Sequence, residues 1–431
     1  MRPLTFLLTG LPTLAPATLG LAQEPPSLED LLRDTRERRA AVAEELSIRI
    51  EAAIAEIEDA SGLDRDEEAG VVVRALVAMG PAAAPLLVAH LDPGVGASNS
   101  EGYRAERVVD VLRAIGSPAI TDDLLALLEG GSLAGRRNVL RVLETSTEPE
   151  RVVPAVQAAF RANTGSVREA AVLTLGHLGG TRALGVLREA LGDESQKVVD
   201  AAVRTLGLVP GDAVAGLVLE HLGAAGAAES LGALATFYEL RSGLLEDEEH
   251  QMALAGLLVH PLADVRGATA FLESWTRLEV EPRPAVRRAL EPLKRHVDVT
   301  LREATLVFLA RNRDKGARRD LLRPYDDRID RQRGYPGAWT SRGDALYRLG
   351  EFTAAIKDYR EAIDLMNPRN KKADPYIGAA RCYARREKFK EARDYLQRAP
   401  LGMDELQALA EDPAFAEMLT TRYRDVFRLP Q

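Results

Sequence analysis

The stretch from Ser166 to Gly211 contains the same helical unit twice. SVREAAVLTLGHLGG begins at Ser166, and KVVDAAVRTLGLVPG follows 31 residues later with valine, alanine, leucine and glycine at matching positions. A repeat of this length is too short to form a domain and fits two helices with two turns. Its apolar faces can be buried only against neighbouring copies. The sequence therefore predicts a stack of helix pairs that exposes a large surface.

A ladder of leucines marks successive units of this stack. The leucines are Leu76, Leu112, Leu143, Leu175 and Leu206, at spacings of 36, 31, 32 and 31 residues. The residue four positions after each is mostly glycine or proline, which end helices. The longer first spacing is explained by a Gly/Ser/Asn-rich insertion at 92–102, for which we expect a mobile loop.

These units resemble HEAT repeats, particularly the short bacterial variety found in phycobilisome lyases. The resemblance rests on Ala-Ala-Val-x-x-Leu-Gly at 170–176 and 201–207, and on the Val-Arg pair at 167–168 that returns at 265–266. It implies an α-α superhelix, which we place at residues 63–313. A charged linker, formed by a short helix and a hinge, is expected at 314–337, because this segment is crowded with both signs of charge and contains Pro324.

A second repeat type follows the linker. Trp339, Gly343, Leu346, Gly350, Phe352, Ala355, Tyr359 and Ala362 carry its first copy, and Tyr376, Ala380, Tyr383, Phe389, Ala392, Leu396 and Ala399 carry the second. The spacing resembles tetratricopeptide repeats, and the turn at 367–374 accounts for a period longer than usual. We predict two such repeats at 338–400 and capping helices at 401–431. The fold class is therefore all-α, with tandem α-solenoids.

The N-terminus has the layout of a secretory signal peptide. Residues 1–22 carry one early arginine, an apolar stretch and the small-x-small triplet Gly-Leu-Ala before Gln23. We therefore expect an exported protein in the bacterial periplasm or cell envelope, with no integral membrane span after cleavage. The following segment, 23–62, has the pattern of an amphipathic helix that caps the first repeat. A dimerising coiled coil is the alternative, although Thr35 and Arg39 interrupt its apolar stripe.

Charge and residue content argue against nucleic-acid binding and against catalysis. The net charge of −9 would not attract phosphates, so no nucleic-acid partner is expected. The six histidines lack the His-Glu dipeptides that hold iron in deoxyhypusine hydroxylase, a HEAT-repeat enzyme, and no pair has His-x-x-x-His spacing. Cys382 is the single cysteine. We therefore predict no catalytic residues, no cofactor and no metal.

The tetratricopeptide resemblance implies a peptide-binding groove lined by the first helix of each pair. Matching positions are Thr340, Asp344, Tyr347 and Arg348 in the first unit, and Ile377, Arg381 and Arg385 in the second. Tyr347, Arg348, Arg381 and Arg385 could hold an acidic segment of a protein or peptide partner. The alternative is that these charges only keep the face soluble.

The overall prediction is a non-catalytic, exported scaffold that mediates protein–protein interaction. The alternative is a lyase-like or accessory enzyme subunit that holds a small molecule or cofactor in the HEAT groove. This alternative rests on fold analogy.

Overall fold

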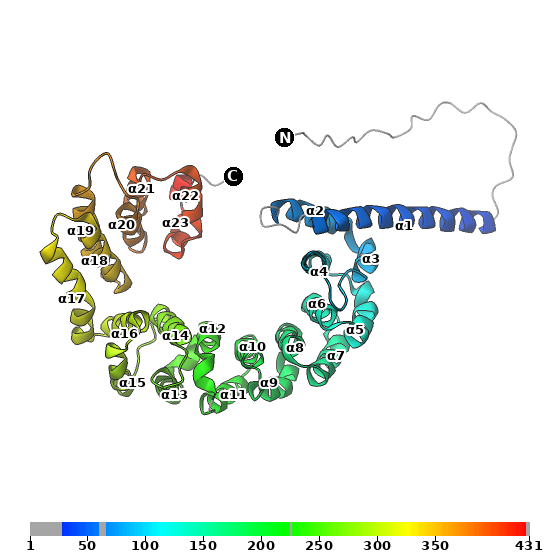
Figure 1. Cartoon of the computed structure of the whole chain (residues 1–431), viewed down its shortest axis with the longest axis horizontal. Coiled ribbons are helices and arrows are strands. Elements are labelled where there is room, and N and C mark those ends of the chain that lie inside the picture. Colours follow the sequence, from blue (N-terminus) through cyan, green and yellow to red (C-terminus); the bar gives the residue numbers. More distant parts are fainter. Residues whose placement is uncertain (1–27, 60–65, 225, 428–431) are drawn as a thin grey trace.

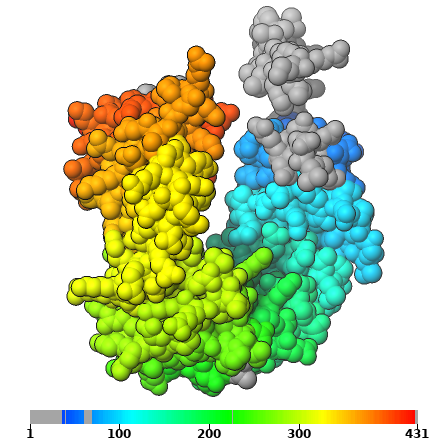
Figure 2. Space-filling model, turned by 60° about the vertical axis from the view of Figure 1, so that its left-hand side comes forward, coloured from blue at the N-terminus to red at the C-terminus, as the bar shows by residue number. Residues whose placement is uncertain are grey.

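The computed structural model describes residues 28–59, 66–224 and 226–427, and throughout these ranges the regular structure is helical. The helices form an open arc, with the N-terminal helix α1 (Leu28–Asp59) at one end and the last helices at the other (Figure 1). Figure 2 shows a hollow between the N-terminal arm and the C-terminal arm. The all-α solenoid prediction is confirmed. The signal peptide predicted at 1–22 lies outside the described residues.

The first solenoid is built of two layers of helices. The even-numbered helices from α4 to α16 line the concave side of the arc. Their odd-numbered partners lie on the outer side (Figure 1). The inner series is α2 (Asp66–Ala78), α4 (Asn99–Ile115), α6 (Leu133–Leu143), α8 (Gly165–Leu178), α10 (Gln196–Leu206), α12 (Leu231–Leu240), α14 (Val265–Leu278) and α16 (Val299–Arg311), in which each helix contacts the next. The outer series is α3 (Ala84–Val88), α5 (Thr121–Gly130), α7 (Pro149–Ala162), α9 (Leu184–Leu191), α11 (Ala213–Leu222), α13 (Glu248–Leu258) and α15 (Pro284–Ala289).

Short 3-10 turns connect many of these helices. They are η1 (Gly80–Ala82), η2 (Pro118–Ile120), η3 (Gly180–Ala183), η4 (Ala227–Ser230), η5 (Ser242–Glu246), η6 (Glu291–Arg295), η7 (Leu409–Glu411), η8 (Pro413–Phe415) and η9 (Arg422–Phe427).

The leucine ladder lies in the core between the inner and outer helices. All five of its leucines are at most 1% exposed. The glycine after the fourth of them, Gly176, faces Thr205 of the next inner helix, and a Cβ at this glycine would lie 2.5 Å from the threonine Cγ2. The small residue therefore allows α8 and α10 to approach closely.

The insertion at 92–102 contains local hydrogen bonds and continues into the first turn of α4. Asp92 accepts hydrogen bonds from the backbone N–H groups of Ser132 (2.8 Å) and Gly94 (2.9 Å). Ser98 and Glu101 form a capping box at the start of α4, which begins at Asn99. These caps satisfy part of the backbone of the segment, and its mobility stays a prediction.

Only the C-terminal part of α1 is buried against the rest of the chain. Ile50, Ile54 and Ile57 are buried against the body, whereas Val42 is 65% exposed. The described side chains from 40 to 45 are all exposed, so the helix extends beyond the repeat that it caps.

The segment expected as a charged linker forms a continuous helix, α17 (Lys315–Arg331), with Pro324 inside it. Ala317, Leu321, Leu322 and Ile329 are buried, and α17 contacts both α16 and α18. The charged side chains of α17 are exposed, while its aliphatic side chains are buried. The helix is longer than the short helix that the sequence indicates, and the hinge stays a prediction.

The second solenoid contains four helices and a short helical tail. The four are α18 (Pro336–Arg348), α19 (Phe352–Asp364), α20 (Asp374–Ala384) and α21 (Phe389–Arg398), followed by α22 (Met403–Ala408) and α23 (Ala416–Leu419). Phe415, Met418 and Phe427 of the tail form one apolar cluster with Ala392 and Leu396 of α21. The tail thereby closes the end of the stack.

Two buried histidines predict that the fold loses stability in mild acid. Burial lowers the pKa of His221, whose ring nitrogens have no hydrogen-bond partner among the described residues. Burial also lowers the pKa of His250, whose Nδ1 lies 2.6 Å from the Tyr238 hydroxyl. The unfolded chain therefore binds protons more readily, and the stability present above the ordinary histidine pKa of about 6.5 is lost as pH falls below it.

Urea denaturation at several pH values between 7.5 and 5 checks this expectation. The free energy of unfolding should fall across this range, and less steeply in His221→Leu, which removes one of the two groups. A free energy that is constant or rises toward pH 5 would contradict it.

Candidate functional site

Tyr359 of α19 is held between two glycines on the flanking helices. A Cβ at Gly343 of α18 would lie 2.8 Å from the tyrosine Cε1, and a Cβ at Gly378 of α20 would overlap the same ring. The tyrosine is 1% exposed, and its hydroxyl donates a 2.7 Å hydrogen bond to Oδ1 of Asp344. The two glycines therefore leave room for the tyrosine ring between α18 and α20. The tyrosine hydroxyl in turn fixes the orientation of the Asp344 carboxylate.

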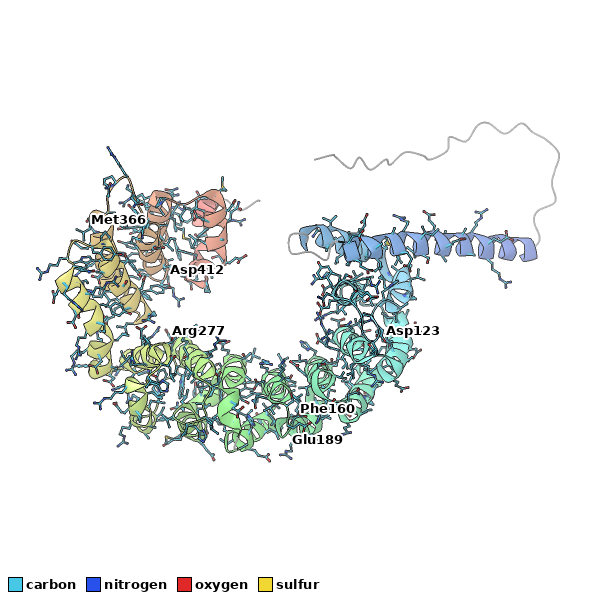
Figure 3. The ribbon with its side chains drawn as sticks, in the orientation of Figure 1. Asp123, Phe160, Glu189, Arg277, Met366 and Asp412 are labelled. Atoms are coloured by element: carbon cyan, nitrogen blue, oxygen red, sulfur yellow. The ribbon has the colours of Figure 1, made fainter. Side chains whose placement is uncertain are left out.

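Asp344 lines an open cavity of about 580 Å³ beside the first turn of α18. The surrounding protein raises the pKa of its carboxyl, although the side chain remains accessible to solvent. The cavity is lined by Arg328, Tyr335, Pro336, Gly337, Thr340, Ser341, Asp344, Leu365, Met366, Asn367, Asn370, Lys372, Asp374 and Pro375. Met366 lies on the connection from α19 to α20 (Figure 3). The cavity thus combines polar, charged and apolar walls.

Only some of the residues predicted for the groove line this cavity. Thr340 and Asp344 line the cavity just described, whereas Tyr347, Arg348, Ile377, Arg381 and Arg385 do not.

Arg348 and Arg381 already have carboxylate partners within the chain. Arg348 pairs with Glu303 of α16 at 2.9 Å, and Arg381 pairs with Asp412 of the tail at 2.5 Å. Arg385 is exposed and has no ion-pair partner among the described residues. Only this arginine is therefore available to a ligand without breaking an internal ion pair.

Two further cavities lie where the solenoids meet. Arg277, Arg311 and Arg348 line one of about 210 Å³ with an apolar floor that includes Ala304 and Val307. The other, of about 640 Å³, is lined by residues of both solenoids and the tail, including Arg311 and Arg385. Figure 3 places Arg277 and Asp412 on the inner side of the arc.

Acidic residues balance the arginines at this junction. Arg277 pairs with Glu239, and Arg311 pairs with Glu279 at 3.0 Å. The junction is therefore not a strongly basic surface, and an acidic ligand would compete with carboxylates of the chain itself.

The structure identifies groove residues that the sequence analysis missed. Gly378, Glu303 and Asp412 were not predicted to contribute, and the partners at 303 and 412 lie 45 and 31 positions from their arginines. In the sequence, Gly378 inside the second repeat was the signal that could have indicated a close contact with Tyr359.

The described residues offer little for covalent or metal chemistry. The thiol of Cys382 is buried, and burial raises its pKa to about 12, so it stays protonated at neutral pH. No group of three or more His, Cys, Asp or Glu side chains within the described ranges could hold a metal ion. Among the described helices, none is both long and apolar enough to cross a membrane.

The fold and its grooves define an α-solenoid made of two kinds of helical repeat. A family model for HEAT repeats matches residues 152–236, and a family model for tetratricopeptide repeats matches residues 336–399. The chain thus carries HEAT repeats followed by C-terminal tetratricopeptide repeats, as predicted. No curated protein matches the chain.

Proposed function

We propose that this protein is a non-catalytic scaffold that binds a protein partner on the inner side of its arc, chiefly in the tetratricopeptide groove. Both repeat families are typical of protein–protein interaction. The observation that carries the proposal is the open cavity of about 580 Å³ along α18, which no segment of the described chain covers. An extended segment of a partner fits such a groove.

The acidic-segment hypothesis now depends on Arg385. We expect Arg385→Glu to lower partner binding about tenfold or more, because reversing an exposed, unpaired charge replaces attraction by repulsion at little cost to the fold. The measurement is the affinity of the full chain for a partner captured from envelope extracts and then purified.

Arg386→Glu is the matched control, since it makes the same change one position along on another exposed side chain. Equal binding by wild type and Arg385→Glu would remove the acidic segment from the proposal. Reversal of Arg348 or Arg381 is a poorer test, because it also breaks the ion pairs with Glu303 and Asp412.

Export to the periplasm or cell envelope is the second part of the proposal. It is supported by the sequence of residues 1–22. Mass spectrometry of the protein from its own cells should find a mature N-terminus at Gln23 in the envelope or periplasmic fraction. A full-length chain in the cytosol would contradict export. Co-purification of a chromophore or metal in stoichiometric amount would instead favour the lyase-like alternative.

A further inference from the structure

The cavity beside Asp344 contains two carboxylates without a cationic partner. Asp344 accepts one hydrogen bond, from the Tyr359 hydroxyl at 2.7 Å, and it forms no ion pair with the described residues. Asp374 lines the same cavity, and the ion pairs of the described chain do not include it either. The two carboxylates therefore line an open cavity and have no ion-pair partner among the described residues.

Two cations, Arg328 and Lys372, line the same cavity, and two others nearby are held in ion pairs. Arg348 and Arg381, whose charges act on Asp344, are paired with Glu303 and Asp412. Arg328 lies over the Tyr335 ring, with its guanidinium carbon 5.6 Å from the centroid. Lys372 is on the exposed turn between α19 and α20.

The other walls of the cavity contain both apolar and polar side chains. Pro336, Leu365, Met366, Pro375 and the Tyr335 ring line it together with Thr340, Ser341, Asn367 and Asn370. Lysine and arginine side chains have the complementary form, because an aliphatic stem carries the charge at its end. A glutamate would face two like charges, and a purely apolar side chain would leave both carboxylates unpaired.

We propose that this cavity binds a lysine or arginine side chain of an extended partner segment, seated between Asp344 and Asp374. The inference rests on the proposed function and adds the chemical identity of a residue in the bound segment. Tyr359 acts as a positioning residue, because its hydroxyl fixes one oxygen of Asp344 and leaves the other directed to the ligand. The surrounding protein raises the pKa of Asp344, and a bound cation would lower it again.

Selection of random peptides displayed on phage against the immobilised full chain tests this proposal. We expect the enriched peptides to share one lysine or arginine. Synthetic versions with norleucine or citrulline at that position should bind at least tenfold more weakly. Asp344→Asn/Asp374→Asn should lose the preference, and Asp344→Lys/Asp374→Lys should enrich aspartate or glutamate instead.

Asp364→Asn is the matched control, because it neutralises an exposed aspartate near the end of α19 that does not line the cavity. Enriched peptides without lysine or arginine would overturn the proposal, as would selection of the same peptides by the double asparagine variant. Failure to enrich any peptide would also overturn it. Peptides that bind the groove without this preference would leave the scaffold function standing, so the two failures are distinguishable.

Discussion

Replacement of Tyr359 by alanine is expected to cost about 3–5 kcal/mol of stability in the C-terminal solenoid. The ring is 1% exposed and fills the space that Gly343 and Gly378 leave between α18 and α20. Truncation leaves a cavity that neither glycine can fill, and it also removes the hydrogen bond to Asp344. Urea denaturation followed by circular dichroism should show an earlier transition for this part of the chain.

Tyr359→Phe separates the two contributions. It keeps the ring and removes only the 2.7 Å hydrogen bond, so a loss of about 0.5–1.5 kcal/mol is expected. If Tyr359→Ala unfolded at the same urea concentration as wild type, the close packing of α18, α19 and α20 would not exist in solution.

Truncation of Trp275 to alanine is expected to have a comparable effect, about 3–5 kcal/mol, in the first solenoid. The indole is 1% exposed and lies between Phe271 and Phe308, with ring centroids 5.8 and 5.1 Å away. Its Nε1–H donates a 3.1 Å hydrogen bond to the Val280 carbonyl. The substitution therefore removes the ring contact with Phe308 that helps to join α14 to α16, and leaves the partly buried Val280 carbonyl without this donor.

The second tryptophan provides the matched control. Trp339 is partly exposed and near the start of α18, so Trp339→Ala should cost clearly less than Trp275→Ala. Denaturant unfolding gives the free energy of unfolding of each variant and of the wild type. Tryptophan fluorescence and circular dichroism serve as the two probes. Equal losses for the two variants would mean that the aromatic cluster around Trp275 does not hold the stack together.

The repeat register could be predicted from sequence because each unit encodes its own core. Leu175 and Leu206 recur with their alanines and glycines, and burial in a stack of helices needs no distant partner to be specified. The helical period is also local, so the number and order of the repeats follow from the pattern.

The segment between the solenoids could not be predicted in the same way. Its charges and Pro324 favour a linker, but the burial of Leu321 and Ile329 depends on the neighbouring helices α16 and α18, which α17 contacts. Local composition does not contain that information.

The helices that carry the predicted groove residues could be predicted, but the ion pairs of these residues could not. The tetratricopeptide spacing placed Asp344, Arg348 and Arg381 on the correct helices. Which charges are available to a ligand depends on Glu303 and Asp412, which belong to other elements of the fold. Pairings between such distant positions cannot be inferred from one sequence.

Hydrogen–deuterium exchange of the full chain, with and without its purified protein partner, tests the central claim most directly. A partner segment in the groove predicts slower exchange in α18 and α20 and in the turn at 367–373, with the outer helices α9 and α11 unchanged. Protection confined to α9 and α11, with α18 and α20 exchanging as in the free protein, would contradict it.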